Sequence, residues 1–376
     1  MAGGPIKAEF GLSDAQFGLV GGTAFVLLFS LCSLPLGWLA DRMDRRRLLA
    51  AGILLWSAMT ALCGLAPDFP AFAAARLCVG LGEACLVPAG ISLIRAGVPP
   101  DRRGRAVALF LIGATSGNAL ALLAGGWMLS EVASWRTLFV VASALGPPVA
   151  ALTSMVREPP RISSPGYGAA LRHIGAHRAA YGWLTAATAC VITLAQAQAI
   201  WIPVLFSRVF GLSPGHAAML VGLLFALSAP VGQWIGGTLI DRLKHRPAHS
   251  LLISCCALCL PPAILFCSTD SLTVAAAAYW LFNLTVFTAT PAGLSGWQRL
   301  TPPGLQGSVI ASLTACATLL AIGLGPPLIG ALADRFTLAP ALLMLIVAAG
   351  LTGCALALRG RATFDEAIGR LVDGAD

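Results

Sequence analysis

Charged residues are scarce in this sequence, and their scarcity excludes a water-soluble surface. Asp, Glu, Lys and Arg make up 11% of the 376 residues, whereas hydrophobic residues make up 57% and the mean hydropathy is +0.84. Soluble domains carry about 25% charged residues. Most of the surface is therefore predicted to face lipid, where each crossing needs roughly 20 apolar residues in a helix because the backbone must pair its own polar groups.

The sequence also lacks the residue clusters that enzymes and nucleic-acid-binding proteins need. The net charge is +8, but the 24 Lys and Arg stand in short groups between apolar runs, without a basic face or an aromatic stacking platform. The eleven cysteines lie in apolar runs and are interpreted as small buried side chains, including the lone CxxC of Cys256 and Cys259. No nucleophile stands beside a base and no metal cluster is visible, so we expect no enzymatic activity, no cofactor, no metal and no nucleic-acid partner.

Apolar runs between charged or Pro/Gly-rich segments predict eleven transmembrane helices. Their ranges are 15–39, 48–66, 71–94, 106–128, 136–156, 181–206, 215–240, 249–267, 271–297, 308–332 and 338–358. A polar stretch at 157–180 is interpreted as a linker between two domains. We therefore expect an amino-terminal bundle over 1–156, a cytoplasmic linker over 157–180, a six-helix bundle over 181–358 and a cytoplasmic tail over 359–376.

The positive charges predict the orientation of the helices. Nearly all Lys and Arg fall in every second loop and in the tail; the five exceptions are Lys7, Arg76, Arg136, Arg208 and Arg335. Positive charge is enriched on the cytoplasmic side of a membrane. The amino terminus is therefore expected outside and the carboxyl terminus in the cytoplasm, which agrees with an odd number of helices.

Four short segments recur in one register and indicate an internal repeat. The pairs are Gly11-Leu12-Ser13 with Gly211-Leu212-Ser213, Asp41-Arg42 with Asp241-Arg242, Pro88-Ala89-Gly90 with Pro291-Ala292-Gly293, and Gly104 with Gly307. The first two pairs are 200 residues apart and the last two 203. Two related halves are typical of transporters that bind substrate at the interface between the halves.

The repeat also predicts a helix upstream of Met1. The second Gly-Leu-Ser follows a complete span at 181–206, whereas the first follows only ten residues. Three explanations are open: a start placed too late, a fragment of a longer chain, or a genuine eleven-helix variant of a twelve-helix plan.

A basic loop between the first two spans carries the most specific motif. Gly37-Trp-Leu-Ala-Asp41-Arg42-Met-Asp44-Arg45-Arg46-Arg47 closely resembles the cytoplasmic signature loop of the major facilitator superfamily. By that resemblance, the acid at 41 would face the start of the helix at 308–332 and hold an inward gate shut. Asp44 stands where the family usually has Gly, which puts the turn geometry in question. The alternative is a solvated positive-inside loop. A degenerate second copy keeps Asp241 and Arg242.

An arginine and a carboxylate inside the span at 71–94 are the candidates for proton coupling. Arg76 and Glu83 are seven residues apart, close to two turns, and so share one face of the helix. A charged acid at the centre of a membrane helix costs at least about 2.5–3.5 kcal/mol, and nearby cations and burial shift its pKa in opposite directions. Glu83 could therefore load and release a proton. The alternatives are a structural hydrogen bond for Glu83 and snorkelling or a structural pair for Arg76.

Polar and aromatic residues within the other spans are candidates for lining a cavity. They are Asn118, Gln196, Gln198, Trp201, Gln233, Trp280 and Asn283. For each of them, lipid-facing or interhelical packing is the alternative. Gly113 and Gly117 resemble the family's gate-forming glycine helix, although such spacing also serves ordinary helix packing.

Taken together, the motifs resemble the bacterial spinster-like branch of the major facilitator superfamily. They are GLSDAQFGLV, GWLADRMDRRRL, RLCVGLGEACLVPAG, PPDRRGRA, the Trp135-Arg136 pair, REPPR and GLGPPLIGALADR. The resemblance implies an all-α major facilitator fold of two pseudo-symmetric bundles, with eleven helices of a parental twelve. It further implies a monomeric, proton-coupled secondary transporter of the bacterial inner membrane that moves a small organic or lysolipid-like solute by alternating access. An organic anion and proton symporter of a neighbouring branch, or a truncated membrane protein that does not transport, remain alternatives.

Overall fold

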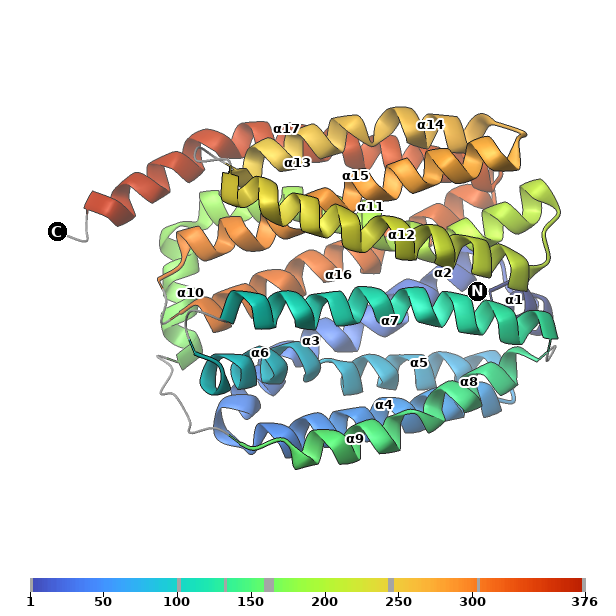
Figure 1. Cartoon of the computed structure of the whole chain (residues 1–376), viewed down its shortest axis with the longest axis horizontal. Coiled ribbons are helices and arrows are strands. Elements are labelled where there is room, and N and C mark those ends of the chain that lie inside the picture. Colours follow the sequence, from blue (N-terminus) through green and yellow to red (C-terminus); the bar gives the residue numbers. More distant parts are fainter. Residues whose placement is uncertain are drawn as a thin grey trace.

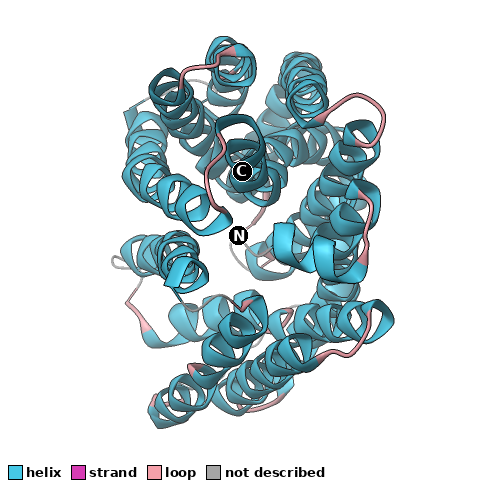
Figure 2. Ribbon diagram, turned by 90° about the vertical axis from the view of Figure 1, so that its right-hand side faces the viewer, coloured by secondary structure: helices cyan, strands magenta, loops and turns pink. Residues whose placement is uncertain are grey.

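The computed structural model describes residues 3–99, 103–131, 134–158, 166–242, 247–302 and 305–373. The described residues contain helices and connecting loops only (Figure 2). In Figure 1 the helices of the amino-terminal half lie below those of the carboxyl-terminal half, and all run roughly along the long axis. The fold class predicted from composition, an all-α membrane protein, is confirmed.

Each half consists of long helices, several of which are interrupted. The amino-terminal half comprises α1 (Gly3–Phe10), α2 (Asp14–Gly18), the π-helical η1 (Leu19–Ala24), α3 (Phe25–Arg42), α4 (Arg45–Leu65), α5 (Phe69–Glu83), α6 (Leu86–Gly97), α7 (Arg103–Glu131), α8 (Trp135–Ala144) and α9 (Gly146–Met155). The remainder comprises α10 (Gly166–Ala176), α11 (Arg178–Phe210), α12 (Pro214–Arg242), α13 (Pro247–Leu258), α14 (Leu260–Ser268), α15 (Leu272–Leu300), α16 (Gln306–Ala333) and α17 (Leu338–Asp373).

The helices coincide with the predicted spans. Among the described residues, nine helical stretches are long and apolar enough to cross a membrane, or ten if the bent α11 is one span. The eleventh predicted span, 106–128, falls within the 29-residue helix α7. Two differences concern the polar segments. The linker contains α10, and the last helix continues to Asp373 instead of ending near 358.

Proline positions explain three interruptions inside predicted spans. The helix restarts after Leu145, Cys259 and Cys85, and in each case a proline follows within three residues. Because proline has no N–H and its ring clashes with the carbonyl four residues earlier, it fits best in the first turn of a helix and weakens the helix further in, although α16 continues through Pro326 and Pro327. One predicted span therefore becomes two short helices at each of these sites.

Two glycines with left-handed backbone support the internal repeat. Gly11 and Gly211 have φ of +62° and +66°, and they end α1 and α11 respectively. Such a conformation favours glycine, which has no Cβ to clash with the following carbonyl. We name the end of the bundle that carries both Gly-Leu-Ser segments the Gly-Leu-Ser end, and the opposite end, with Arg45 to Arg47, the arginine end.

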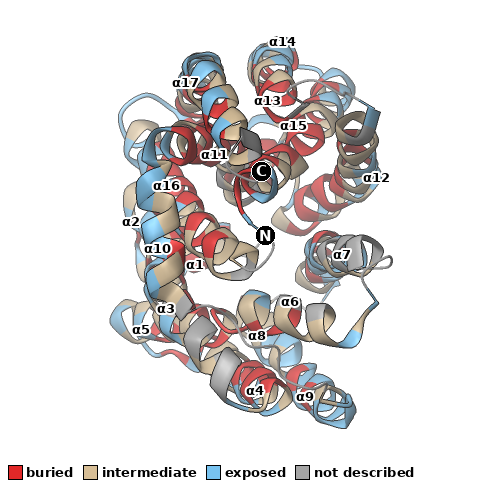
Figure 3. Cartoon of the chain, turned by 90° about the vertical axis from the view of Figure 1, so that its left-hand side faces the viewer, coloured by how far each residue is buried: buried red, intermediate tan, exposed pale blue. Residues whose placement is uncertain are grey.

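The two halves have separate cores and meet along two helix pairs. One large cluster of buried side chains belongs mainly to α11–α17, and two smaller clusters belong to α1–α9. Between the halves, α16 packs along α2, η1 and α3, and α7 packs on α12. Figure 3 shows buried segments on the faces that the helices turn to one another and exposed segments around the rim. The rim matches a surface that faces lipid.

Candidate functional site

Glu83 lies at the interruption between α5 and α6, and two glycines fix its place. A Cβ on Gly82 would lie 2.7 Å from the Trp56 amide nitrogen and 2.9 Å from the Gly52 carbonyl of α4, and a Cβ on Gly80 would collide with the Phe25 carbonyl of α3. The backbone before Glu83 is therefore held against α3 and α4 at once. The side chain is half-buried, and none of the described residues makes a hydrogen bond or ion pair to its carboxylate. This arrangement leaves the carboxylate available to a proton.

Arg76 shares the side of α5 that packs on α3. Its guanidinium lies 5.6 Å from the centre of the Phe25 ring, and the ring of Phe25 stacks on that of Phe29. A cation over an aromatic face is stabilised by the ring quadrupole by about 0.5–2 kcal/mol. Helical periodicity places Gly80 and Glu83 on the same side. Arg76 thus supplies a positive charge about two turns from the carboxylate, at a position turned toward α3 and away from lipid.

The other cavity candidates occupy different environments. Trp201 is fully buried and donates from Nε1 to the Pro326 carbonyl at 3.2 Å, and Asn283 is fully buried beside Tyr279. Gln233 accepts a hydrogen bond of 3.1 Å from Thr115 of the opposite half. Asn118 is exposed, and Gln196 and Trp280 are half-buried. The side chain of Gln198 lies outside the described residues.

The arginine end holds an ionic cluster built around Asp44 and Glu158. Asp44 accepts from the backbone N–H of Arg46 and Arg47, which caps α4, and its carboxylate binds the Arg46 guanidinium at 2.7 and 3.1 Å. These contacts hold the pKa of Asp44 well below its usual range. Glu158 lies 3.3 Å from Nε of the buried Arg45, which also donates to the Ser92 carbonyl.

The cluster answers the question that the sequence raised about position 44. Asp44 has φ of −63°, so the turn needs no glycine, and the carboxylate serves as a helix cap. The side chains of Gly37, Asp41, Arg42 and Asp241 lie outside the described residues, and Arg242 is exposed. The predicted contact of Asp41 with α16 therefore stays a prediction. Glu158 was not singled out from the sequence, although it stands in the REPPR segment.

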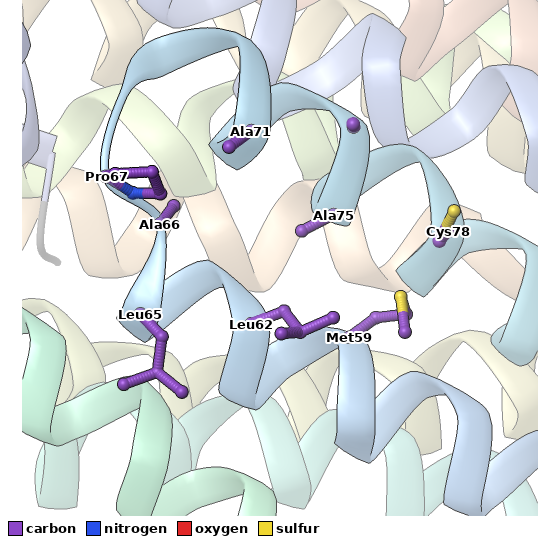
Figure 4. A pocket seen from close by; sticks show the side chains of 9 residues that line it. Met59, Leu62, Leu65, Ala66, Pro67, Ala71, Ala75 and Cys78 are labelled. Atoms are coloured by element: carbon purple, nitrogen blue, oxygen red, sulfur yellow. The ribbon is translucent and has the colours of Figure 1, made fainter.

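A cavity of about 290 Å³ lies apart from these polar residues. Figure 4 shows its lining, which is formed by apolar side chains and Cys78 from α4, α5 and the turn between them. It opens widely and presents no charged group to a solute. None of the predicted site residues lines it, so it is not a candidate for the substrate site.

The Gly-Leu-Ser end holds ion pairs that the sequence did not single out. Asp14, nearly fully buried, binds both Nη atoms of Arg208 at 2.8 and 2.9 Å and also pairs with Lys7. Glu9 binds Arg136 at 2.6 Å and accepts from Trp135 Nε1. All three cations, Lys7, Arg136 and Arg208, are among the five that do not follow the positive-inside pattern. That exception was the available signal, because a cation that departs from the predicted charge pattern of a membrane protein is expected to have an acidic partner.

Comparison with known proteins agrees with the fold and the motifs. Residues 1–326 match the sequence profile of the Major Facilitator Superfamily. An MFS-type efflux pump of Mycolicibacterium smegmatis is 26% identical over 371 residues, which cover 93% of this chain and 84% of the pump. Protein spinster of Drosophila melanogaster is 26% identical over 275 residues, which cover 66% of this chain and 45% of that protein.

A solved structure resembles the chain over nearly its whole length. It is the crystal structure of a bacterial homolog to the human lysosomal transporter Spinster, in an inward-facing and unoccupied conformation. The TM-score is 0.85 at 25% sequence identity, with 97% of this chain and 93% of the solved chain covered. The arrangement of helices thus has a counterpart of known structure.

Proposed function

This chain belongs to the Major Facilitator Superfamily, and we propose that it is a proton-coupled secondary transporter that moves a small organic or amphipathic, lysolipid-like solute by alternating access. In this mechanism two bundles rock about a central site that opens to one side of the membrane at a time. We further propose that it resides in the inner membrane as a monomer, with its arginine end in the cytoplasm.

The observation that carries the coupling proposal is the setting of Glu83. Its carboxylate lies in a membrane segment without a hydrogen-bond partner among the described residues, and Arg76 is the cation that acts on it electrostatically. Ionisable groups inside membrane segments are costly and commonly mark proton relays or substrate paths. Substrate or a conformational change that alters the distance from Arg76 would change the proton affinity of Glu83, which couples the two events.

The amphipathic substrate class is supported by the balance of charge and aromatic surface near this carboxylate. Arg76 offers a cation for an anionic headgroup, and Phe25 and Phe29 offer stacked aromatic faces next to it. A solute with both an acidic group and an apolar portion would use both features.

The test is substrate-driven proton movement in proteoliposomes. The protein is reconstituted with a pH-sensitive dye in the lumen, lysophospholipids and organic acids are added in turn, and the change in lumenal pH is recorded. Glu83→Gln, which preserves shape but cannot ionise, should abolish proton movement while allowing exchange of solute down its own gradient. The control is Glu131→Gln, the same chemical change at the end of α7, which should leave proton movement intact. Unchanged coupling in Glu83→Gln would remove Glu83 from the mechanism.

A further inference from the structure

We propose that Asp14, Arg208 and Asp334 form a latch that closes the Gly-Leu-Ser end of the transporter by joining the two halves. Asp14 belongs to the amino-terminal half, and the other two residues belong to α11 and the end of α16 in the carboxyl-terminal half. The latch would have to break before the protein could open toward this end. It therefore controls the outward-opening step of the proposed alternating access.

The first part of the latch is an ion pair of restricted geometry. The Asp14 carboxylate, only 6% exposed, receives two parallel N–H bonds from the Arg208 guanidinium, at 2.8 and 2.9 Å. This bidentate arrangement is the strongest form of Arg–carboxylate contact. Lys7, in the same half as Asp14, adds a second cation. When the halves separate, Asp14 can stay neutralised by Lys7, so that the broken latch does not leave an unpaired buried acid.

The second part is a carboxylate of one half that caps a helix of the other. Asp334 accepts from the backbone N–H of Asp14 at 2.9 Å and of Ala15 at 3.0 Å. These amides begin the continuous helical stretch α2, η1 and α3, whose first N–H groups have no partner within the helix. Asp334, a residue of the carboxyl-terminal half, therefore accepts hydrogen bonds from backbone amides of the amino-terminal half. Separation would expose these amides as well as the carboxylate.

Next to these ion pairs, the backbones of the two halves approach so closely that only glycine fits at several positions. Cβ atoms on Gly18 and Gly330 would collide with the Pro326 and Asp14 carbonyls, and a Cβ on Gly22 would lie 2.6 Å from the Ile322 carbonyl. Phe17 meets Trp201 edge to face, with ring centres 5.6 Å apart. Across the seam, the Thr23 hydroxyl donates to the Gly323 carbonyl at 2.6 Å. Within α16 this carbonyl would normally accept from the N–H of residue 327, but Pro327 has no N–H. The Thr23 hydroxyl of the other half therefore takes the place of the missing donor.

The second helix pair closes at the same end. A Cβ on Gly126 of α7 would lie 2.7 Å from the Gly215 carbonyl of α12, whereas a Cβ on Gly113 or Gly117, nearer the arginine end, would meet nothing within 4 Å. Figure 1 shows α7 and α12 close together toward the Gly-Leu-Ser end and apart toward the arginine end. The structure thus represents the state in which the latch is closed.

The proposal rests on the alternating access proposed above, and hydrogen exchange tests it without requiring transport. Wild type and Asp334→Asn are compared in lipid nanodiscs by mass spectrometry of backbone exchange. Asp334→Asn should speed exchange at 14–18 and 326–333 by roughly tenfold, the effect of losing one charge-assisted bond. It should also slow exchange at the arginine end, at 33–43 and 306–312, because closing one end accompanies opening the other. Arg208→Gln should act in the same direction, and Arg208→Lys less strongly.

The control is Glu9→Gln, which breaks an ion pair at the same end but within one half. It should leave the arginine-end segments at wild-type exchange rates. Faster exchange of 14–18 in Asp334→Asn without slower exchange at the arginine end would mean local fraying and would overturn the latch, as would no change at either segment. Reciprocal exchange combined with an absence of solute movement in proteoliposomes would support the latch and count against the proposed function instead.

Discussion

Glu9 offers a test of electrostatics at the level of a single side chain. Hydrogen bonds from Arg136 and Trp135 hold the pKa of this carboxyl below its ordinary value of 4.5. Because the folded state prefers the ionised form, the contribution of Glu9 to stability is present above pH 4.5 and is lost as the pH falls through the folded pKa. Glu9→Gln should lower the unfolding temperature in micelles at pH 7, and its deficit should shrink toward zero as the pH falls below 4.

The measurement is thermal unfolding followed by tryptophan fluorescence, which reports on Trp135 among others. Glu366→Gln is the matched control, since Glu366 also pairs with an arginine, Arg370, but both side chains are more than 60% exposed. Exposed pairs contribute little. A Glu9→Gln deficit that persists unchanged at low pH would show that the loss comes from altered packing and not from charge.

Single residues also mark the limit of what the sequence could predict. Arg76 and Glu83 were identified because a charge in an apolar run is conspicuous wherever the run folds. Asp14 and Asp334 were not, because each stands in a short polar segment where a charge is expected; Arg208 was conspicuous only as an exception to the positive-inside pattern, and its partner was not apparent. Their significance arises only when residues about 200 and 320 positions apart meet, and no local pattern encodes such a pairing.

At the level of helices, the crossing of α7 and α12 predicts opposite outcomes for two similar substitutions. Gly126→Ala places a methyl group 2.7 Å from the Gly215 carbonyl and should destabilise the protein by about 1–3 kcal/mol, as overpacking does. Gly113→Ala, on the same helix, meets nothing within 4 Å and should be neutral or stabilising by up to about 1 kcal/mol. Unfolding temperatures in micelles distinguish the two. Equal losses for both would contradict the close contact at Gly126.

The positions of the transmembrane helices were predictable from the sequence, but the places where these helices are interrupted were less so. Long apolar runs located the spans, since only a helix can satisfy the backbone in lipid. The interruptions at Leu145 and Cys259 each precede a pair of prolines, so the signal was present in the sequence. The π-helical turns of η1 carry no such signal. They lie against the proline-containing part of α16, so their geometry depends on packing between the halves.

For the whole molecule, the arginine distribution predicts an orientation that reporter insertions can check. Alkaline phosphatase inserted at Asp68, in the turn between α4 and α5, should be active because this turn is expected outside. Green fluorescent protein fused after Asp376 should fluoresce, since the tail is expected in the cytoplasm. Exchanging the two reporters between these positions is the control and should silence both. An active phosphatase at the carboxyl terminus would reverse the assignment of the two ends.

The left-handed glycines at 11 and 211 also record how the two halves have diverged. The register between the halves is 200 residues at these glycines and at Asp41 and Asp241, but 203 at Pro88 and Pro291. The second copy is therefore three residues longer than the first between its aspartate, Asp41 or Asp241, and its proline, Pro88 or Pro291. The length difference begins only after the stretch from the left-handed glycine to Asp41 in the first copy, or to Asp241 in the second. The first copy of that stretch packs on α16 and the second copy, α12, packs on α7, so the segment that joins the two halves has the same length in both.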